Sequence, residues 1–245
     1  FYLGILFAIP ISFFAGYALE YLVIRHLYKR DHMEQVLATF GLILFFNEAI
    51  RVGFGPAALH SNLPASLSGF VYILPEIPYP EFRLLVILVG FACAIGIHLL
   101  VSRTRLGATV RAGASNAAMT AALGVNITRL RRLVFAIGAC FAGVAGMMLG
   151  PLTSVDPGMG EPLLILSLVV IIIGGIGSVR GAFIAAIIVG MVDTMGRVML
   201  PVILRSFMEQ ASADGAGPAL ASMMVYILMA VVLVFKPTGL FPPNR

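Results

Sequence analysis

Long apolar runs constrain this chain more than any other feature of its sequence. A helix needs about 20 predominantly apolar residues to cross the roughly 30 Å hydrocarbon core of a bilayer. Seven such segments are predicted, at about 3–24, 35–54, 83–101, 131–150, 162–177, 180–200 and 219–236. Only 11% of the 245 residues are charged, whereas a soluble domain averages about 25%. The chain is therefore expected to be all-α, a polytopic integral membrane helical bundle that forms one transmembrane domain over residues 1–245.

The fifth segment and the start of the chain depart from this simple pattern. Segment 162–177 is short and ends in glycines, so we expect it to be tilted, broken or re-entrant. The chain begins at Phe1, already inside an apolar run, without the basic start and small-residue cleavage site of a signal peptide. We therefore expect at least one further membrane span upstream of Phe1.

The links between the apolar segments differ in charge. Link 25–32 is basic, and link 55–82 has no Lys or Arg. Link 151–161 has Asp156 and Glu161 but no base. The link after the third segment has no acid and six arginines, which are Arg103, Arg105, Arg111, Arg129, Arg131 and Arg132. Because basic links stay on the cytoplasmic side of a membrane, this alternation predicts the orientation. It also accounts for the net charge of +5 without a nucleic-acid partner.

Motifs for catalysis and metal binding are missing from the sequence. Neither lysine follows a Gly-x-x-x-x-Gly run, so there is no nucleotide-binding P-loop, and no His-Glu-x-x-His motif occurs. Cys93 and Cys140 lie within apolar segments and the four histidines are scattered, which favours neither a disulfide nor a metal site. We expect a non-catalytic protein without cofactor or metal, so that any ATP it uses is hydrolysed by another subunit.

Three polar residues within the apolar segments are candidates to line a transport pathway. They are Asn47, Glu48 and Asp193. Ionisable residues inside a membrane suggest function by default. A second interpretation is an ion pair between Glu48 and Arg51, at i and i+3, whose side chains reach the membrane interface. The sequence leaves both interpretations open, and the same choice applies to Asp193.

Segment 111–126, RAGASNAAMTAALGVN, is the most informative polar stretch. Ser115 or Asn116 can cap the N-terminus of a short helix, and Gly124 suits its C-terminal stop. Met119 and Leu123, four residues apart, would then form an apolar ridge flanked by alanines. A helix on a lipid surface usually carries Lys or Arg on its polar face and bulky apolar anchors on the other. Docking into a groove of a partner protein is therefore favoured over lipid contact.

Small residues predict close backbone approach at two places. In the fourth segment they recur every fourth position, at Gly138, Ala142, Gly146 and Gly150, a pattern typical of helix contacts in membranes. Segment 174–181, GGIGSVRG, separates two apolar segments with hardly any loop. Its glycines permit positive φ angles and close packing. It is either a tight turn between helices or a hinge beside the pathway or a partner subunit.

Four regions of the chain carry a family resemblance. They are MEQVLATFGLILFFNEAIRVGFG (33–55), TRLGATVRAGASNAAMTAALGVN (104–126), the pair FAIGACFAGVAGMMLG (135–150) and GGIGSVRGAFIAAIIVG (174–190), and KPTGLF (236–241). In this order, and over nearly the whole chain, they resemble the permease subunits of branched-chain amino acid importers of the ATP-binding cassette (ABC) class, the Liv type.

The resemblance implies an architecture and a set of partners. Two permease subunits would form the pathway in the inner membrane, two cytoplasmic ABC ATPases would drive it, and an extracytoplasmic solute-binding protein would deliver and largely select the cargo. The loop at about 102–130 would hold the coupling helix. The residues implied for ATPase coupling are Arg111, Ala112, Ala118, Leu123 and Gly124. Those implied for the glycine turn are Gly174, Gly175, Gly177, Ser178 and Gly181.

Two alternatives remain at the level of sequence. Related permeases carry urea, short amides or other small solutes, and these residues do not separate the substrates. A secondary transporter driven by an ion gradient would show inverted repeats and discontinuous helices. Only the short segment 162–177 suggests a discontinuous helix.

Overall fold

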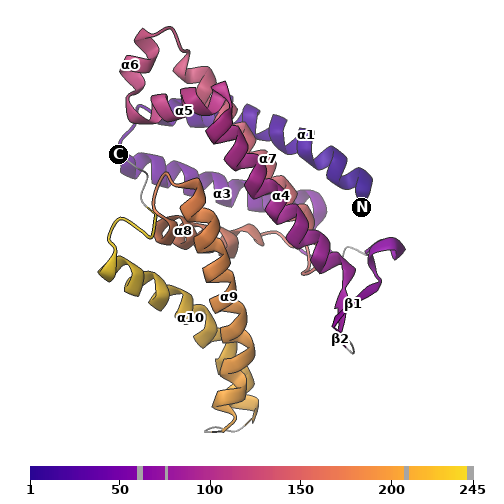
Figure 1. The fold of residues 1–245 in the computed structure, drawn as a ribbon. Helices are drawn as coiled ribbons and strands as arrows, with labels where there is room; N and C mark the ends of the chain where they lie inside the picture. The colour runs from indigo at the N-terminus through magenta and orange to yellow at the C-terminus, as the bar shows by residue number, and fades with distance from the viewer. Residues whose placement is uncertain (60–62, 75–76, 207–209, 242–245) are drawn as a thin grey trace. The chain divides into compact units, whose positions relative to one another are not determined.

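A computed structural model describes residues 1–59, 63–74, 77–206 and 210–241 (Figure 1). Within these residues six helices are long and apolar enough to cross a membrane. They span Tyr2–Leu27, His32–Phe54, Glu81–Arg103, Ile127–Leu149, Val179–Leu204 and Gly215–Phe235. The chain divides into two compact units, Phe1–Met159 and Gly160–Arg245, and each is described by itself.

The helices agree closely with the predicted spans. The first span consists of α1 (Tyr2–Leu19), a π-helical turn η1 (Glu20–Ile24) and α2 (Arg25–Leu27). The other long helices are α3 (His32–Phe54), α4 (Glu81–Arg103), α7 (Ile127–Leu149), α9 (Val179–Leu204) and α10 (Gln210–Phe235). The predicted fifth span is α8 (Gly160–Gly174), whose 15 residues give a length of about 22 Å, less than a bilayer core. Whether this short helix is tilted, broken or re-entrant in the membrane stays a prediction.

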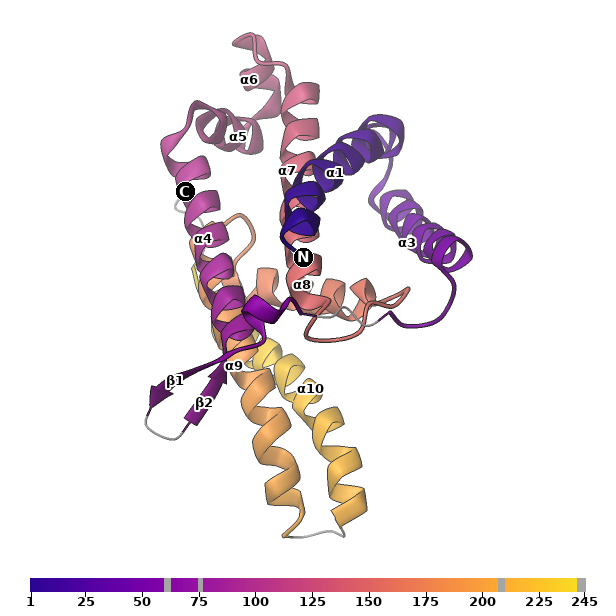
Figure 2. The ribbon, with the colours of Figure 1, turned by 90° about the vertical axis from the view of Figure 1, so that its right-hand side faces the viewer.

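The first unit is organised around the contact of α1 with α7, which lie side by side (Figures 1 and 2). At Gly16 a Cβ atom would collide with the Cβ of Ala139 and lie 3.3 Å from the Cα of Ala136. At Gly143 it would meet the Ser12 side chain. The predicted close helix contact is confirmed, but it uses a different face of α7 from the one predicted.

The predicted stripe lies on another face of α7. A Cβ atom at Gly138 or Gly146 would meet nothing within 4 Å among the described residues. Successive small residues four apart drift around a helix of 3.6 residues per turn, so several faces of one alanine- and glycine-rich helix fit such a pattern. The sequence contains more than one small-residue face, and α1 selects only one of them.

The links with few or no basic residues meet at one end of this unit. Leu59 and Val155 pair through two backbone hydrogen bonds of 2.9 Å each. Tyr2 Oη lies 3.2 Å from Ser66 Oγ, and the rings of Phe1 and Phe82 are in edge contact. The same link holds a 3₁₀ turn η2 (Ala65–Leu67) and an antiparallel hairpin of β1 (Phe70–Leu74) and β2 (Ile77–Pro80), which the sequence analysis did not predict.

The basic links meet at the opposite ends of α1 and α7. The Arg131 guanidinium stacks on the ring of Tyr28 at 4.9 Å from its centroid. Two short helices, α5 (Arg105–Ser115) and α6 (Ala117–Ala122), lie at this end between α4 and α7 (Figure 2). The alternation of charge along the sequence is therefore also a separation in space within the unit.

The second unit has its own apolar core. One cluster of buried residues on α8, α9 and α10 consists of Val169, Ile173, Ala185, Val189 and Val225. Helices α9 and α10 form a hairpin (Figure 2). A Cβ atom at Gly196 would lie 3.1 Å from the Cβ of Ala221, so the glycine permits a close helix contact.

Candidate functional site

The loop between α4 and α7 begins with a tight helix–helix corner. Thr104 caps α5, because its Oγ1 accepts a hydrogen bond from the Gly107 N–H at 3.1 Å. A Cβ atom at Gly107 would collide with the Val101 carbonyl oxygen and lie 2.5 Å from that of Leu100. The Arg111 side chain donates a hydrogen bond to the same Val101 carbonyl. Arg111, predicted to contact an ATPase, thus ties α5 to the end of α4 within its own chain.

Helix α6 has the boundaries that its caps predict. Asn116 Oδ1 accepts from the Met119 N–H at 2.9 Å. Gly124 follows the helix with a φ of +88°, the left-handed conformation that glycine adopts without strain. Of the two capping candidates that the sequence offered, Asn116 is confirmed. The Ser115 hydroxyl instead bonds back to the Ala112 carbonyl.

The surface of α6 is small and apolar. Met119 is 63% exposed and Leu123, which caps the helix C-terminus, is 78% exposed. Ala118 beside them is also exposed, as is Ala112 on α5. On its other side Thr120 is buried, and its hydroxyl donates to the Asn116 carbonyl at the start of the same helix. The loop therefore presents two large apolar side chains on a helix that is held at both ends.

The glycine segment is a packed turn between α8 and α9. Ser178 caps α9 by accepting from the Gly181 N–H at 3.0 Å. Gly175 and Gly177 have φ angles of +98° and +91°. A Cβ atom at Gly174 would lie 2.6 Å from the Ala182 nitrogen, so the backbones on either side of the turn touch.

The C-terminal KPTGLF segment packs against this turn, a contact that sequence analysis missed. The Leu240 N–H donates to the Ile173 carbonyl at 2.8 Å, and the Phe241 N–H donates to the Gly174 carbonyl at 3.2 Å. A Cβ atom at Gly239 would lie 2.5 Å from the Gly175 Cα. The geometry matches the tight-turn interpretation, with the C-terminal segment closing the turn.

The polar residues predicted for the pathway lie in separate units. Asn47 and Glu48 are on α3, and a Glu48 oxygen lies 3.9 Å from the Arg51 guanidinium, as the i, i+3 spacing predicts. Asp193 is on α9 and accepts a 2.9 Å hydrogen bond from Arg197, one helical turn further on. Both pairs are local to one helix.

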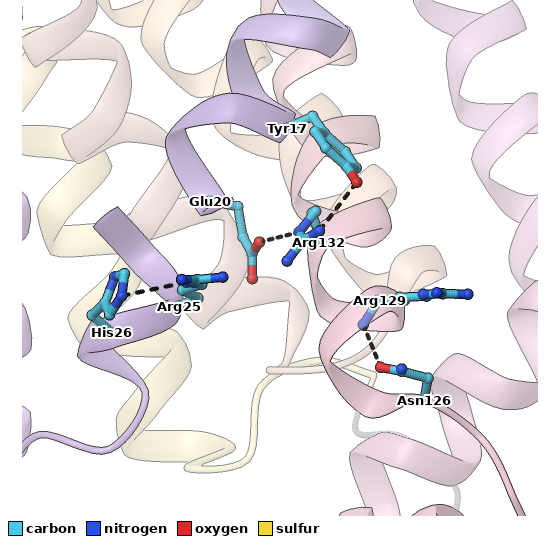
Figure 3. A network of polar contacts seen from close by, with 7 residues as sticks. All are labelled: Tyr17, Glu20, Arg25, His26, Asn126, Arg129 and Arg132. Carbon is cyan, nitrogen blue, oxygen red and sulfur yellow. Dashed lines mark hydrogen bonds and ion pairs between the residues drawn. The ribbon is translucent and has the colours of Figure 1, made fainter. Parts of the chain in front are cut away.

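A buried ion pair, unlike these, joins two helices far apart in sequence (Figure 3). The Glu20 side chain has 0% exposed surface, and its Oε2 accepts a 2.9 Å hydrogen bond from the Arg132 Nε. Arg132 is 13% exposed, and its Nη1 donates to the Tyr17 hydroxyl at 3.1 Å. The other Glu20 oxygen, Oε1, is buried without a hydrogen-bond partner among the described residues.

Aromatic rings surround the Arg132 guanidinium. It lies 5.1 Å from the ring centroid of Tyr17 and 4.7 Å from that of Tyr21. The Arg25 guanidinium also stacks on the Tyr21 ring, at 4.4 Å from its centroid. Glu20 is the first residue of the π-helical turn, and such bulges often occur at functional sites. No motif in the sequence predicts a role for Glu20 or Arg132. Glu20 lies next to a basic link, which could have suggested an ion pair, but six arginines of the loop before α7 were possible partners.

Tyr28 and Arg131 continue this cluster beyond the span. Partial burial, and then the negative charge of Glu20, raise the pKa of the Tyr28 phenol above its ordinary value of 10.0, against the opposing effect of Arg131. The phenol is therefore neutral at physiological pH. Among the described residues no group of three or more His, Cys, Asp or Glu side chains could hold a metal ion.

The part of the chain that the structure describes has six helices long and apolar enough to cross a membrane, which defines a multi-pass membrane protein. Comparison with known proteins then gives its family. The model of the family described as branched-chain amino acid transport system / permease component matches residues 1–233. The chain belongs to this family of transport permeases, and it is a multi-pass protein of the inner membrane.

Several relatives align with almost the whole chain. The high-affinity branched-chain amino acid transport system permease protein BraD of Pseudomonas aeruginosa is 28% identical over 92% of this chain and 69% of BraD. The corresponding protein LivH of Escherichia coli is 23% identical over 97% of this chain and 73% of LivH. A probable LivH of Methanocaldococcus jannaschii is 26% identical over 95% and 73%. No solved structure matches the chain.

Proposed function

We propose that this chain is the non-catalytic translocation subunit of an ABC importer for branched-chain amino acids or chemically related solutes. It works with a second permease subunit, two cytoplasmic ATPases and an extracytoplasmic solute-binding protein. The family and the names of its relatives support the cargo class. Asn47, Glu48 and Asp193 are proposed to line the pathway, because polar and ionisable residues in spans are usually retained for function.

The exposed ridge of α6 carries the proposal of an ATPase docking surface. Met119 and Leu123 are both large, apolar and more than half exposed, at the end of the unit where the arginine-rich link lies. Alanines beside them leave a smooth face that a groove can enclose, as in other helix-in-groove interfaces. We assign ATPase coupling to Arg111, Ala112, Ala118, Leu123 and Gly124, around the ridge that Met119 and Leu123 form.

The contacts of the loop support a mechanical role. Motion of α6 would reach α4 through the Gly107 corner and the Arg111 hydrogen bond. It would reach α1 through α7 and the Glu20–Arg132 pair. ATP-driven closure of the docked ATPases would thus switch the bundle between outward-open and inward-open states, a rearrangement of packed helices as rigid bodies.

The first test replaces Leu123 by Asp in the complete importer. A charge placed in an apolar groove loses the contact and must be desolvated, so L123D should reduce ATPase co-purification by at least about tenfold and abolish ATP-driven uptake. The matched control is L59D, the same change at an exposed leucine on the end with few basic residues. L59D should retain ATPase co-purification.

The readouts separate docking from folding and from transport class. L123D should keep the melting temperature of the isolated permease, because Leu123 packs against little of its own chain. Undiminished ATPase association in L123D would remove the docking role. Uptake by wild type that follows an ion gradient without ATPase or binding protein would overturn the proposed function altogether.

A further inference from the structure

A cavity of about 400 Å³ lies beside the basic end of α7. Most of its wall is apolar and comes from α5 and α7, through Val110, Ile127, Leu130, Val134 and Phe135. Arg131 and Tyr28 provide the polar part of the lining. An apolar cavity with one convergent cation is a common composition of a ligand site.

The residues that line the cavity include one cation, Arg131, and no acid. Arg131 itself has no ion pair among the described residues, and its guanidinium stacks on the Tyr28 ring. Lys29 and Arg30 follow Tyr28 in the chain, and Arg30 pairs with Glu34 at the exposed surface. The nearest buried acid, Glu20, is already paired with Arg132. Asp31 is the other acid of this link. An anionic ligand fits this balance better than a neutral or cationic one.

The position of the cavity along the helices indicates where the ligand comes from. Ile127 is the first residue of a membrane-spanning helix, and Tyr28 follows the last residue of another. Tyrosines are typical of this depth, where ring and hydroxyl meet the headgroup region. No α6 residue lines the cavity, so it is separate from the ridge to which we assign the ATPase.

We propose that this cavity binds an anionic phospholipid of the cytoplasmic leaflet. Part of an acyl chain lies against Val110, Leu130 and Val134, and the phosphate pairs with Arg131. Basic pockets between membrane helices on the cytoplasmic side bind anionic headgroups in this way. The site goes beyond the proposed transport function and depends only on the orientation that the basic links predict.

The test measures how phosphatidylglycerol stabilises the complete importer in detergent, with phosphatidylcholine as the neutral probe. Wild type should gain thermal stability with phosphatidylglycerol and much less with phosphatidylcholine. R131Q should bind phosphatidylglycerol about fivefold more weakly, equivalent to about 1 kcal/mol, which is typical of one basic residue near an anionic surface. V134F should also weaken binding, because it fills the cavity without changing any charge.

R129Q is the matched control. It removes a charge about half a helical turn from Arg131, and Arg129 does not line the cavity. It should bind phosphatidylglycerol as wild type does. Equal losses in R129Q and R131Q would indicate only diffuse surface charge and overturn the proposal. Inorganic phosphate alone should give no stabilisation; if it matches phosphatidylglycerol, the ligand is a free anion. A loss of ATPase association in R131Q, with lipid binding intact, would assign the cavity to the ATPase instead.

Discussion

The ion pairs of this protein fall into two kinds. Glu20 and Arg132 lie 112 residues apart, on the π-helical turn η1 and on α7, and their side chains are 0% and 13% exposed. Glu48 and Arg51 lie on one helix, three residues apart, and both are exposed. Asp193 and Arg197 are again on one helix, and Arg197 is about half exposed.

The fold depends on the buried pair more than on the local pairs. A local pair forms wherever its helix forms, and exposed pairs contribute only about 0–1 kcal/mol. A buried pair must overcome the desolvation of both groups, so it persists only where geometry and further hydrogen bonds compensate. Arg132 has such compensation from Tyr17 and the stacked rings, whereas Glu20 Oε1 has none among the described residues. The Glu20 pair is therefore vulnerable as well as specific.

The largest expected effect comes from breaking the buried pair. R132Q leaves the Glu20 carboxylate buried without its charged partner, and such losses cost about 3–5 kcal/mol in proteins generally. At about 2–4 °C per kcal/mol for a chain of this size, the melting temperature of the detergent-solubilised permease should fall by at least about 6 °C. R129Q, the same change at an exposed position of α7, should shift it by less than about 2 °C.

A double-mutant cycle sharpens this comparison. E20Q/R132Q removes both charges and should recover part of the stability lost in R132Q, because no uncompensated carboxylate remains. Additive losses in the double variant would mean that the two side chains act independently. In that case the pair does not hold α1 against α7.

A second, smaller effect tests which face of α7 packs against α1. G16A places a Cβ against Ala139 and Ala136, and overpacking of this kind typically costs about 1–3 kcal/mol. G138A adds a methyl where the described residues leave open space, so the better helix propensity of alanine should dominate. Melting temperatures should therefore move in opposite directions. A loss in G138A that equals the loss in G16A would show that the predicted stripe packs after all.

Sequence patterns predicted the features that depend on neighbouring residues. Seven apolar segments predicted the six long helices and the shorter α8, with end errors of a few residues, and Asn116 and Gly124 predicted the bounds of α6. Glu48 with Arg51 is a pair that i, i+3 spacing alone identifies. In each case the physical cause acts within one or two helical turns.

Features that depend on distant residues could not be predicted in this way. Any of six arginines could have paired with Glu20, and only the packing of α1 on α7 selects Arg132. The closure of the glycine turn by Gly239 needs backbone geometry that leaves no trace in local spacing. Residues named for partner contact stay predictions, since their partners act from outside the chain.

The smallest expected effect on stability comes from the exposed Glu48–Arg51 pair on α3. Variants of this pair can change transport without changing stability. E48Q should leave the melting temperature within about 2 °C of wild type, because an exposed i, i+3 pair contributes little. If Glu48 lines the pathway as proposed, ATP-driven uptake should nevertheless fall severalfold. R51Q breaks the same pair from the other side and should keep uptake near wild type. Equal uptake in E48Q and R51Q would mean that Glu48 is only an interfacial charge, and the Glu48–Arg51 pair would then have no role in transport.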